Sequence, residues 1–158
     1  MKALLSKIMM ILLLAAGISV FSPSETFSRD CCEEKEQLLE SIGVFSSSNL
    51  YLVYLSLSLI NENIVNDFQL EGYEEILKSI ENINHLTEEN LKKIKKDVLL
   101  SENDQKFIDQ IETACVMLKE DASLLKRYLK SGKEADYDLF FAKHTEAGKF
   151  LEKLFNNK

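Results

Sequence analysis

The chain has few Gly and Pro residues for tight turns, since its 158 residues include one Pro and five Gly, and it has no Trp, a residue that favours strands. A β-sandwich or barrel needs a turn signal about every ten residues, so this composition argues against both. A basic surface for nucleic acid is missing too, because 26 acidic residues outnumber 19 basic ones and the formal charge is -7. With 46% of residues apolar and 28% charged, we expect one soluble, acidic, helical domain.

Residues that carry chemistry are scarce as well. Zinc needs closely spaced Cys and His ligands and covalent haem needs Cys-x-x-Cys-His, but His85 and His144 lie far in sequence from the adjacent Cys31 and Cys32. The chain has no Gly-rich phosphate loop, no Gly-x-Ser-x-Gly elbow and no Glu-x-x-His pair for a di-iron site. We therefore assign no catalytic residue, metal or cofactor, and expect a protein that is not an enzyme.

The first 28 residues have the order of a secretory signal peptide. Lys2 and Lys7 precede an apolar run over residues 8–20, whose length suits a signal better than a membrane span. Small residues then lead to a cut after Ser28. Cleavage leaves residues 29–158 with 17 basic and 25 acidic residues, a net of -8. We expect a periplasmic or extracellular protein without a stable membrane span; a permanent N-terminal anchor is the alternative.

The three cysteines leave alternatives open. Lipid attachment at Cys31 would tether the protein to a membrane, but Arg29 and Asp30 place charges where such a site has small apolar residues. Export favours disulfides, and three cysteines leave at least one unpaired in a monomer. Adjacent cysteines seldom bond each other, so Cys31 or Cys32 is a candidate for a disulfide that joins two copies. We expect Cys115 to be a buried, unreactive thiol; the alternative is that all three stay reduced.

Apolar residues recur at helical spacing in four segments. The expected helices cover about residues 33–68, 71–100, 102–131 and 134–156. Short connections force neighbouring helices to run in opposite directions, which predicts an all-α, antiparallel up-down-up-down four-helix bundle in one domain over residues 29–158. Thr87 has the signature of an N-cap, so the second helix either continues or restarts there. The third and fourth helices have the clearest apolar faces: Ile108, Ile111, Cys115, Leu118, Ala122, Leu125 and Leu129, and then Phe140, His144, Ala147, Leu151 and Leu154.

The first helix is ambiguous. Its predicted buried face follows a 3-and-4 spacing through Leu38, Ile42, Phe45, Asn49, Leu52, Ser56, Leu59 and Asn63. Residues 41–61 carry no charge, so a transmembrane span is the alternative. Six serines and two asparagines in this stretch, and acidic flanks that give no positive-inside signal, favour a buried bundle helix.

Polar residues interrupt the predicted apolar faces near the middle of the bundle. Counted from shared helix ends, Asn49, Thr87 and Cys115 fall at similar heights, with Ser56 and His144 about two turns away. A buried polar group without a partner costs on the order of 1 to 3 kcal/mol. These five residues therefore either satisfy one another and fix the helix register or bind a small ligand, and they are our candidate ligand-binding residues.

One basic cluster lies near the end of the second helix: Lys92, Lys93, Lys95 and Lys96. Cations there complement the negative helix end; an acidic partner is the alternative.

Taken together, the features of the sequence predict an exported, non-enzymatic helical-bundle protein that acts as a protein-interaction or small-ligand-binding module in the cell envelope. The alternative is a bundle that carries a cofactor or performs redox or enzymatic chemistry with its interior polar residues.

Overall fold

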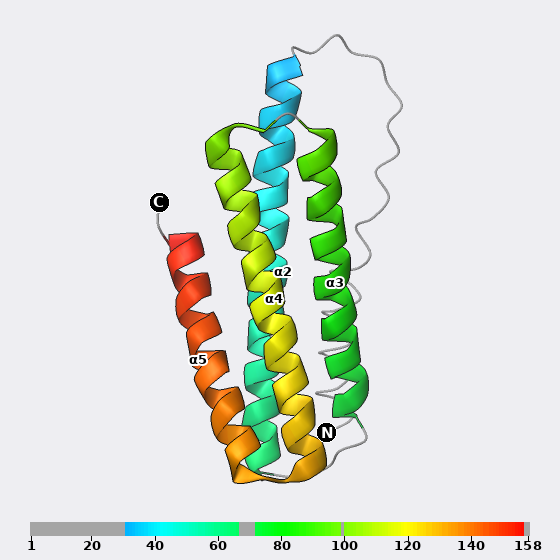
Figure 1. The fold of residues 1–158 in the computed structure, drawn as a ribbon, viewed down its shortest axis with the longest axis vertical. Helices are drawn as coiled ribbons and strands as arrows, with labels where there is room; N and C mark the ends of the chain where they lie inside the picture. Colours follow the sequence, from blue (N-terminus) through cyan, green and yellow to red (C-terminus); the bar gives the residue numbers. More distant parts are fainter. Residues whose placement is uncertain (1–30, 67–71, 99, 157–158) are drawn as a thin grey trace. The chain divides into compact units, whose positions relative to one another are not determined.

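The computed structural model describes residues 31–66, 72–98 and 100–156, and this part of the chain contains four α-helices and no strand (Figure 1). The helices are α2 (Cys31–Asn66), α3 (Tyr73–Asp97), α4 (Glu102–Ser131) and α5 (Glu134–Asn156). For these described residues, the prediction of an all-helical fold with four helices is confirmed. The predicted signal peptide lies outside the described residues. The chain divides into two compact units, Met1–Phe45 and Ser46–Lys158, and the second contains α3, α4, α5 and most of α2.

The helix ends follow the local sequence. A capping box starts α4, in which the Asp104 backbone N–H donates to the Ser101 hydroxyl and the Ser101 N–H donates to the Asp104 carboxylate, both at 3.2 Å. Gly132 ends α4 with φ 62°, a backbone conformation that favours glycine. No restart occurs at Thr87, whose hydroxyl donates to the Ile83 carbonyl at 2.8 Å. α3 is therefore one continuous helix.

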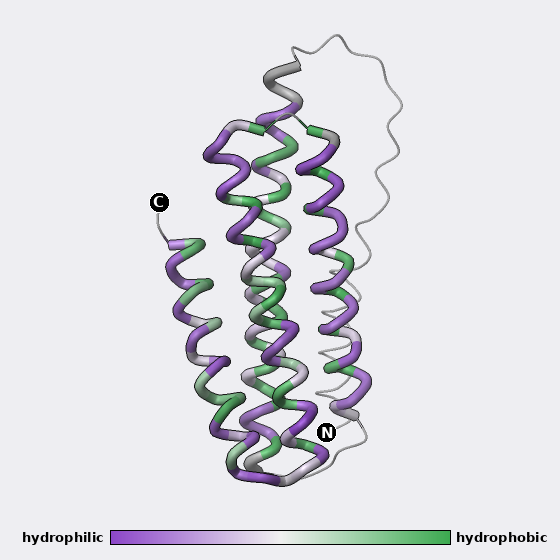
Figure 2. The backbone as a smooth tube through the Cα atoms, viewed as in Figure 1, coloured by the Kyte–Doolittle hydropathy of each residue, from purple (hydrophilic) through white to green (hydrophobic). Residues whose placement is uncertain are grey.

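The core of the second unit comes from one face of each helix. All seven residues of the predicted α4 face are buried, and so are four of the five on α5, with Leu154 partly exposed. The buried side chains of α3 include Tyr73, Leu77 and Ile80. Polar and apolar residues alternate turn by turn along α3, α4 and α5 in Figure 2, as expected for helices that bury one face.

The predicted buried face of α2 is displaced by one residue, and Ser56 is the member of the predicted face that is buried. The residues that pack inside are Ser46, Leu50, Val53, Ser56, Leu57, Ile60 and Ile64. Leu38 and Phe45, assigned to the buried face by spacing, are 44% and 49% exposed. One residue is about 100° around a helix, and because residues 41–61 carry no charge, two neighbouring apolar stripes satisfy the same spacing rule. The Lys35–Ile64 part of α2 also meets the length and hydropathy of a membrane span, a test that core helices of soluble proteins pass as well.

Ion pairs link α3 to α4 along their length. They join Glu74 to Lys130 at 3.1 Å, Glu81 to Lys126 at 3.4 Å, Glu88 to Lys119 at 3.0 Å, and Lys95 to Asp109 at 2.6 Å. As the residue number rises along α3, the number of its partner on α4 falls. Figure 1 shows α4 between α3 and α5.

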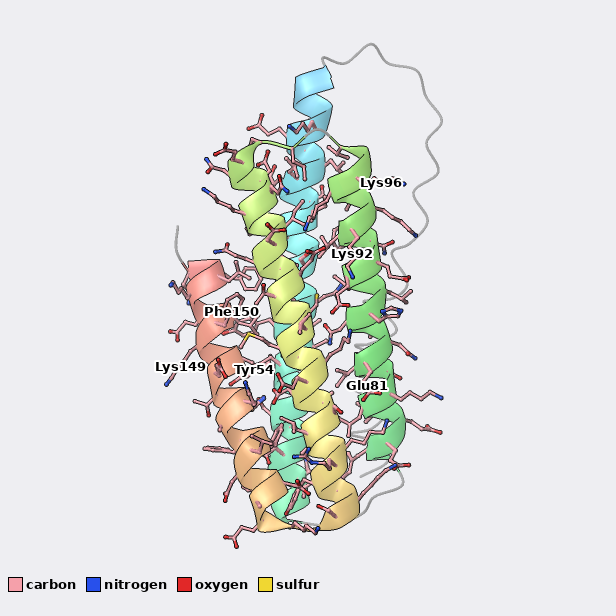
Figure 3. The ribbon with its side chains drawn as sticks, viewed as in Figure 1. Tyr54, Glu81, Lys92, Lys96, Lys149 and Phe150 are labelled. Carbon is pink, nitrogen blue, oxygen red and sulfur yellow. The ribbon has the colours of Figure 1, made fainter. Side chains whose placement is uncertain are left out.

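Within the basic cluster, Lys95 is the residue that pairs across to α4, where it contacts Asp109 and also Glu112 at 2.9 Å. Lys92, Lys93 and Lys96 are exposed, and Figure 3 shows Lys92 and Lys96 on α3. Lys95 therefore links the last turn of α3 to α4.

Candidate functional site

His144 joins three helices through its two ring nitrogens. Its Nδ1 lies 2.6 Å from the Asp121 Oδ2 on α4, and its Nε2 lies 2.8 Å from the Ser58 Oγ on α2. His144 itself belongs to α5. The three side chains form one hydrogen-bonded chain from carboxylate to imidazole to hydroxyl, all within the second unit.

Aromatic rings hold the imidazole in place. Tyr54 stacks on it with ring centroids 4.3 Å apart and an interplanar angle of 12°, and Phe140 lies at 5.2 Å and 24°. Tyr54 is on α2 and is labelled in Figure 3. The Cβ of any residue larger than glycine at position 148 on α5 would lie 2.5 Å from the Tyr54 hydroxyl oxygen. Glycine at 148 therefore leaves the space that Tyr54 occupies.

Burial decreases along the hydrogen-bonded series from Asp121 through His144 to Ser58. The Asp121 side chain is fully buried, His144 is nearly so, and Ser58 is half-buried. Burial raises the pKa of Asp121, and the hydrogen bond with His144 opposes part of that rise. Among the described residues the Asp121 Oδ1 has no hydrogen-bond partner, so His144 carries the interaction that stabilises this carboxylate.

The Ser58 hydroxyl has one proton and two acceptors. It lies within hydrogen-bond distance of His144 Nε2 and also 3.1 Å from the Tyr54 carbonyl. When the imidazole is neutral and Nδ1–H donates to Asp121, Nε2 accepts the Ser58 proton. When the imidazole is charged, Nε2–H donates to Ser58, whose proton then turns to the Tyr54 carbonyl. The orientation of the hydroxyl therefore depends on the proton held by His144.

This connectivity is that of a Ser-His-Asp triad, in which the histidine takes the serine proton and the aspartate orients the ring. α2 lacks one component of such a site, a free backbone N–H that donates to the negative oxygen of the reaction intermediate. Ser58 lies in the interior of the helix, where backbone N–H groups already donate to carbonyls one turn earlier. α2 thus supplies the hydroxyl of Ser58 and α5 supplies the base, but α2 offers no backbone N–H next to Ser58 for an oxyanion.

Of the five predicted ligand-binding residues, only His144 takes part in the hydrogen bonds that link Asp121 to Ser58. Ser56 donates to the Leu52 carbonyl and Thr87 to the carbonyl one turn earlier in its own helix, both at 2.8 Å. Asn49 is half-buried. No hydrogen bond between described residues joins two of the five, so ligand binding by this set stays a prediction.

Cys115 is fully buried, as its position on the α4 face predicts. Burial raises the pKa of its thiol to about 12. The thiol is therefore uncharged and unreactive at neutral pH. The side chains of Cys31 and Cys32 lie outside the described ones, and the disulfide prediction stays untested.

Sequence reasoning missed Ser58 and Asp121. Asp121 follows Leu118 by three residues and precedes Leu125 by four, so the spacing that found the α4 face also includes a carboxylate. A buried position for an acidic residue was the available signal. Ser58 had no such signal, because the buried face of α2 was assigned one residue away.

A second feature of the unit is an exposed apolar row on α2. Tyr51, Leu55 and Leu59 are 46%, 45% and 38% exposed and follow one another at intervals of four residues. The row lies within the uncharged stretch of residues 41–61. Exposed apolar patches of this kind commonly mark interaction sites.

No protein-family model matches the chain, and neither a curated protein nor a solved structure matches it. Function must therefore be argued from the residues and their geometry.

Proposed function

We propose that this chain is an exported helical-bundle protein that acts in the cell envelope as a protein-interaction module. The observation that supports the proposal most is the exposed row formed by Tyr51, Leu55 and Leu59 on α2. Each of these side chains would gain roughly 1 to 2 kcal/mol if a partner covered its remaining apolar surface, given about 25 cal/mol per Å². The row is the surface through which we expect the protein to bind.

The partner we propose is a second copy of the chain. With 17 basic and 25 acidic residues, residues 29–158 have a net charge of -8, so two copies repel each other over most of their surface. Residues 41–61 carry no charge, which lets two α2 helices approach without placing like charges together. Cys31 and Cys32 are at the start of the same helix, and a disulfide between copies there would hold two α2 helices near each other.

The proposal includes an antiparallel up-down-up-down arrangement of the helices. The order of the ion pairs between α3 and α4 supports it for that pair. Between α4 and α5, Arg127 pairs with Asp136 at 2.8 Å and Asp121 with His144 at 2.6 Å, so numbers rise on one helix as they fall on the other. Such a bundle places α2 with one long side available to a partner.

Sedimentation velocity of the mature protein tests self-association. We expect wild type to sediment as a dimer at high micromolar concentration with and without reductant, and Leu55→Lys to sediment as a monomer. Val116→Lys is the matched control, because Val116 is an exposed apolar residue on α4 at 54% and its variant should remain dimeric. A monomeric wild type under both conditions, or equal dissociation of the two variants, would refute the proposal.

Export has a separate test. The intact mass of protein purified from its native envelope should correspond to a chain that begins at Arg29. This expectation follows from the order of Lys2, Lys7, the apolar run and the small residues before the cut. Mature material that still contains Met1 would contradict export with cleavage.

A further inference from the structure

Ser58 differs from the other serines of α2 whose hydrogen bonds are described. Ser41 and Ser56 donate to the carbonyl one turn earlier in their own helix, at 2.7 Å and 2.8 Å. Ser58 has that acceptor too, but its hydroxyl also lies 2.8 Å from an imidazole nitrogen whose other nitrogen contacts a fully buried carboxylate. Burying a carboxylate costs several kcal/mol, and an apolar pair of similar volume would pack as well without that cost. The arrangement therefore calls for a role beyond packing.

We propose that Ser58 is a nucleophile that His144 activates as general base and Asp121 orients, and that it accepts acyl groups from small activated carboxylic esters. Two observations carry the proposal: the unbroken series of hydrogen bonds from Asp121 to Ser58, and the partly exposed position of Ser58 at its outer end. Nucleophilic attack by Ser58 does not require self-association, although Ser58 lies three residues from Leu55 and so next to the apolar row on α2.

The reaction balances without a cofactor. The Ser58 Oγ forms a bond to the ester carbonyl carbon while its proton passes to His144 Nε2. The bond from that carbon to the leaving alkoxide breaks, and the alkoxide takes the proton from His144. Water, deprotonated by the same nitrogen, then attacks the acyl group, releases the carboxylic acid and restores the Ser58 hydroxyl. The sum is ester plus water giving acid plus alcohol.

The geometry also limits the substrate. Because the backbone N–H groups around Ser58 are held in the helix, the negative oxygen of the intermediate gains no help from them, and loss of one such donor costs about 10²- to 10³-fold in rate. Tyr54 is the candidate donor in their place. Its ring stacks on His144, and burial raises its pKa, so its hydroxyl keeps its proton at neutral pH. We expect esters with good leaving groups to react and amides not to react.

A fluorophosphonate tests the nucleophile directly. The reagent forms an O–P bond at an activated serine, fluoride leaves, and the serine proton is lost to the base. We expect the full mature chain to gain one adduct, which tandem mass spectrometry places on Ser58. His144→Asn and Asp121→Asn should slow labelling by at least about 100-fold, the typical contribution of a general base. Ser48→Ala is the control, since Ser48 is an exposed serine on the same helix and its loss should leave the rate unchanged.

Wild type alone provides a second readout that does not depend on the variants folding. A small activated ester, p-nitrophenyl acetate, should slow labelling of Ser58, because the ester and the fluorophosphonate compete for the same hydroxyl. Three results would overturn the proposal: no adduct on Ser58 while an authentic serine hydrolase is labelled in the same tube, equal rates in folded His144→Asn, or a labelling rate that an excess of the ester leaves unchanged.

Discussion

The pair of Asp121 and His144 makes the structure testable by a double-mutant cycle. Replacing His144 with Leu removes the group 2.6 Å from a carboxylate that is fully buried, and it puts an apolar side chain of similar size in its place. Breaking a buried pair on one side costs about 3 to 5 kcal/mol, because the remaining charge has no partner. For a domain of this size we expect the melting temperature to fall by roughly 10 to 20 °C.

The double variant Asp121→Leu with His144→Leu should recover most of that loss. With both polar groups gone no buried charge remains, and similar replacements in other proteins are neutral or stabilising. Urea unfolding at pH 7, followed by far-UV circular dichroism, gives the free energy of unfolding of all four proteins in the cycle. We expect a coupling energy of about 3 kcal/mol.

Acidity provides an independent check on the same variants. Burial raises the pKa of Asp121 in the folded protein, so the folded state holds this proton more tightly than the unfolded state. The resulting stability is present below the unfolded pKa and is lost as the pH rises through the folded pKa. In His144→Leu the hydrogen bond that opposes the rise in the Asp121 pKa is gone. This variant should be less stable than the double variant at pH 7, and the difference in their free energies of unfolding should shrink as the pH is lowered toward 4. A deficit below about 1 kcal/mol at pH 7, or one that does not change with pH, would refute this account of the pair.

Two further predictions concern Gly148 and Cys115. Gly148→Ala should destabilise wild type, because the new Cβ meets the Tyr54 ring. In a Tyr54→Ala protein the same substitution should increase stability by about 1 kcal/mol, because alanine favours the helix more than glycine does. Thermal melts of the four proteins measure both changes, and a change of the same sign in both backgrounds would contradict the contact between position 148 and Tyr54. The pKa of the Cys115 thiol is raised to about 12 in the folded protein. The stability that the protonated thiol contributes is therefore fully present below its unfolded pKa and is lost as the pH rises from 9 toward 12. Between pH 8 and 10.5, Cys115→Ala should therefore lose about 2 kcal/mol less stability than wild type, and equal losses in urea unfolding would contradict burial of the thiol.

The sequence predicts α4 well because its chemistry is unambiguous there. Ser101 and Gly132 lie just outside the two ends of the helix, and charged residues between them leave a single apolar face. Every residue assigned to that face from Ile108 to Leu129 is buried. A spacing rule succeeds when only one stripe of the helix satisfies it.

α2 shows why the rule fails elsewhere, and why the site was missed with it. Between residues 41 and 61 no charge marks the outer side, so the stripe through Leu52 and Leu59 fits the rule as well as the one through Leu50 and Leu57. Packing against the other helices decides between them, and the sequence of α2 alone does not contain that information. The choice buries Leu57 and directs Ser58, one position further around the helix, to His144. It also leaves Leu55 and Leu59 exposed, so a single rotation of α2 determines both the hydrogen-bonded chain and the apolar row on which the two proposals rest.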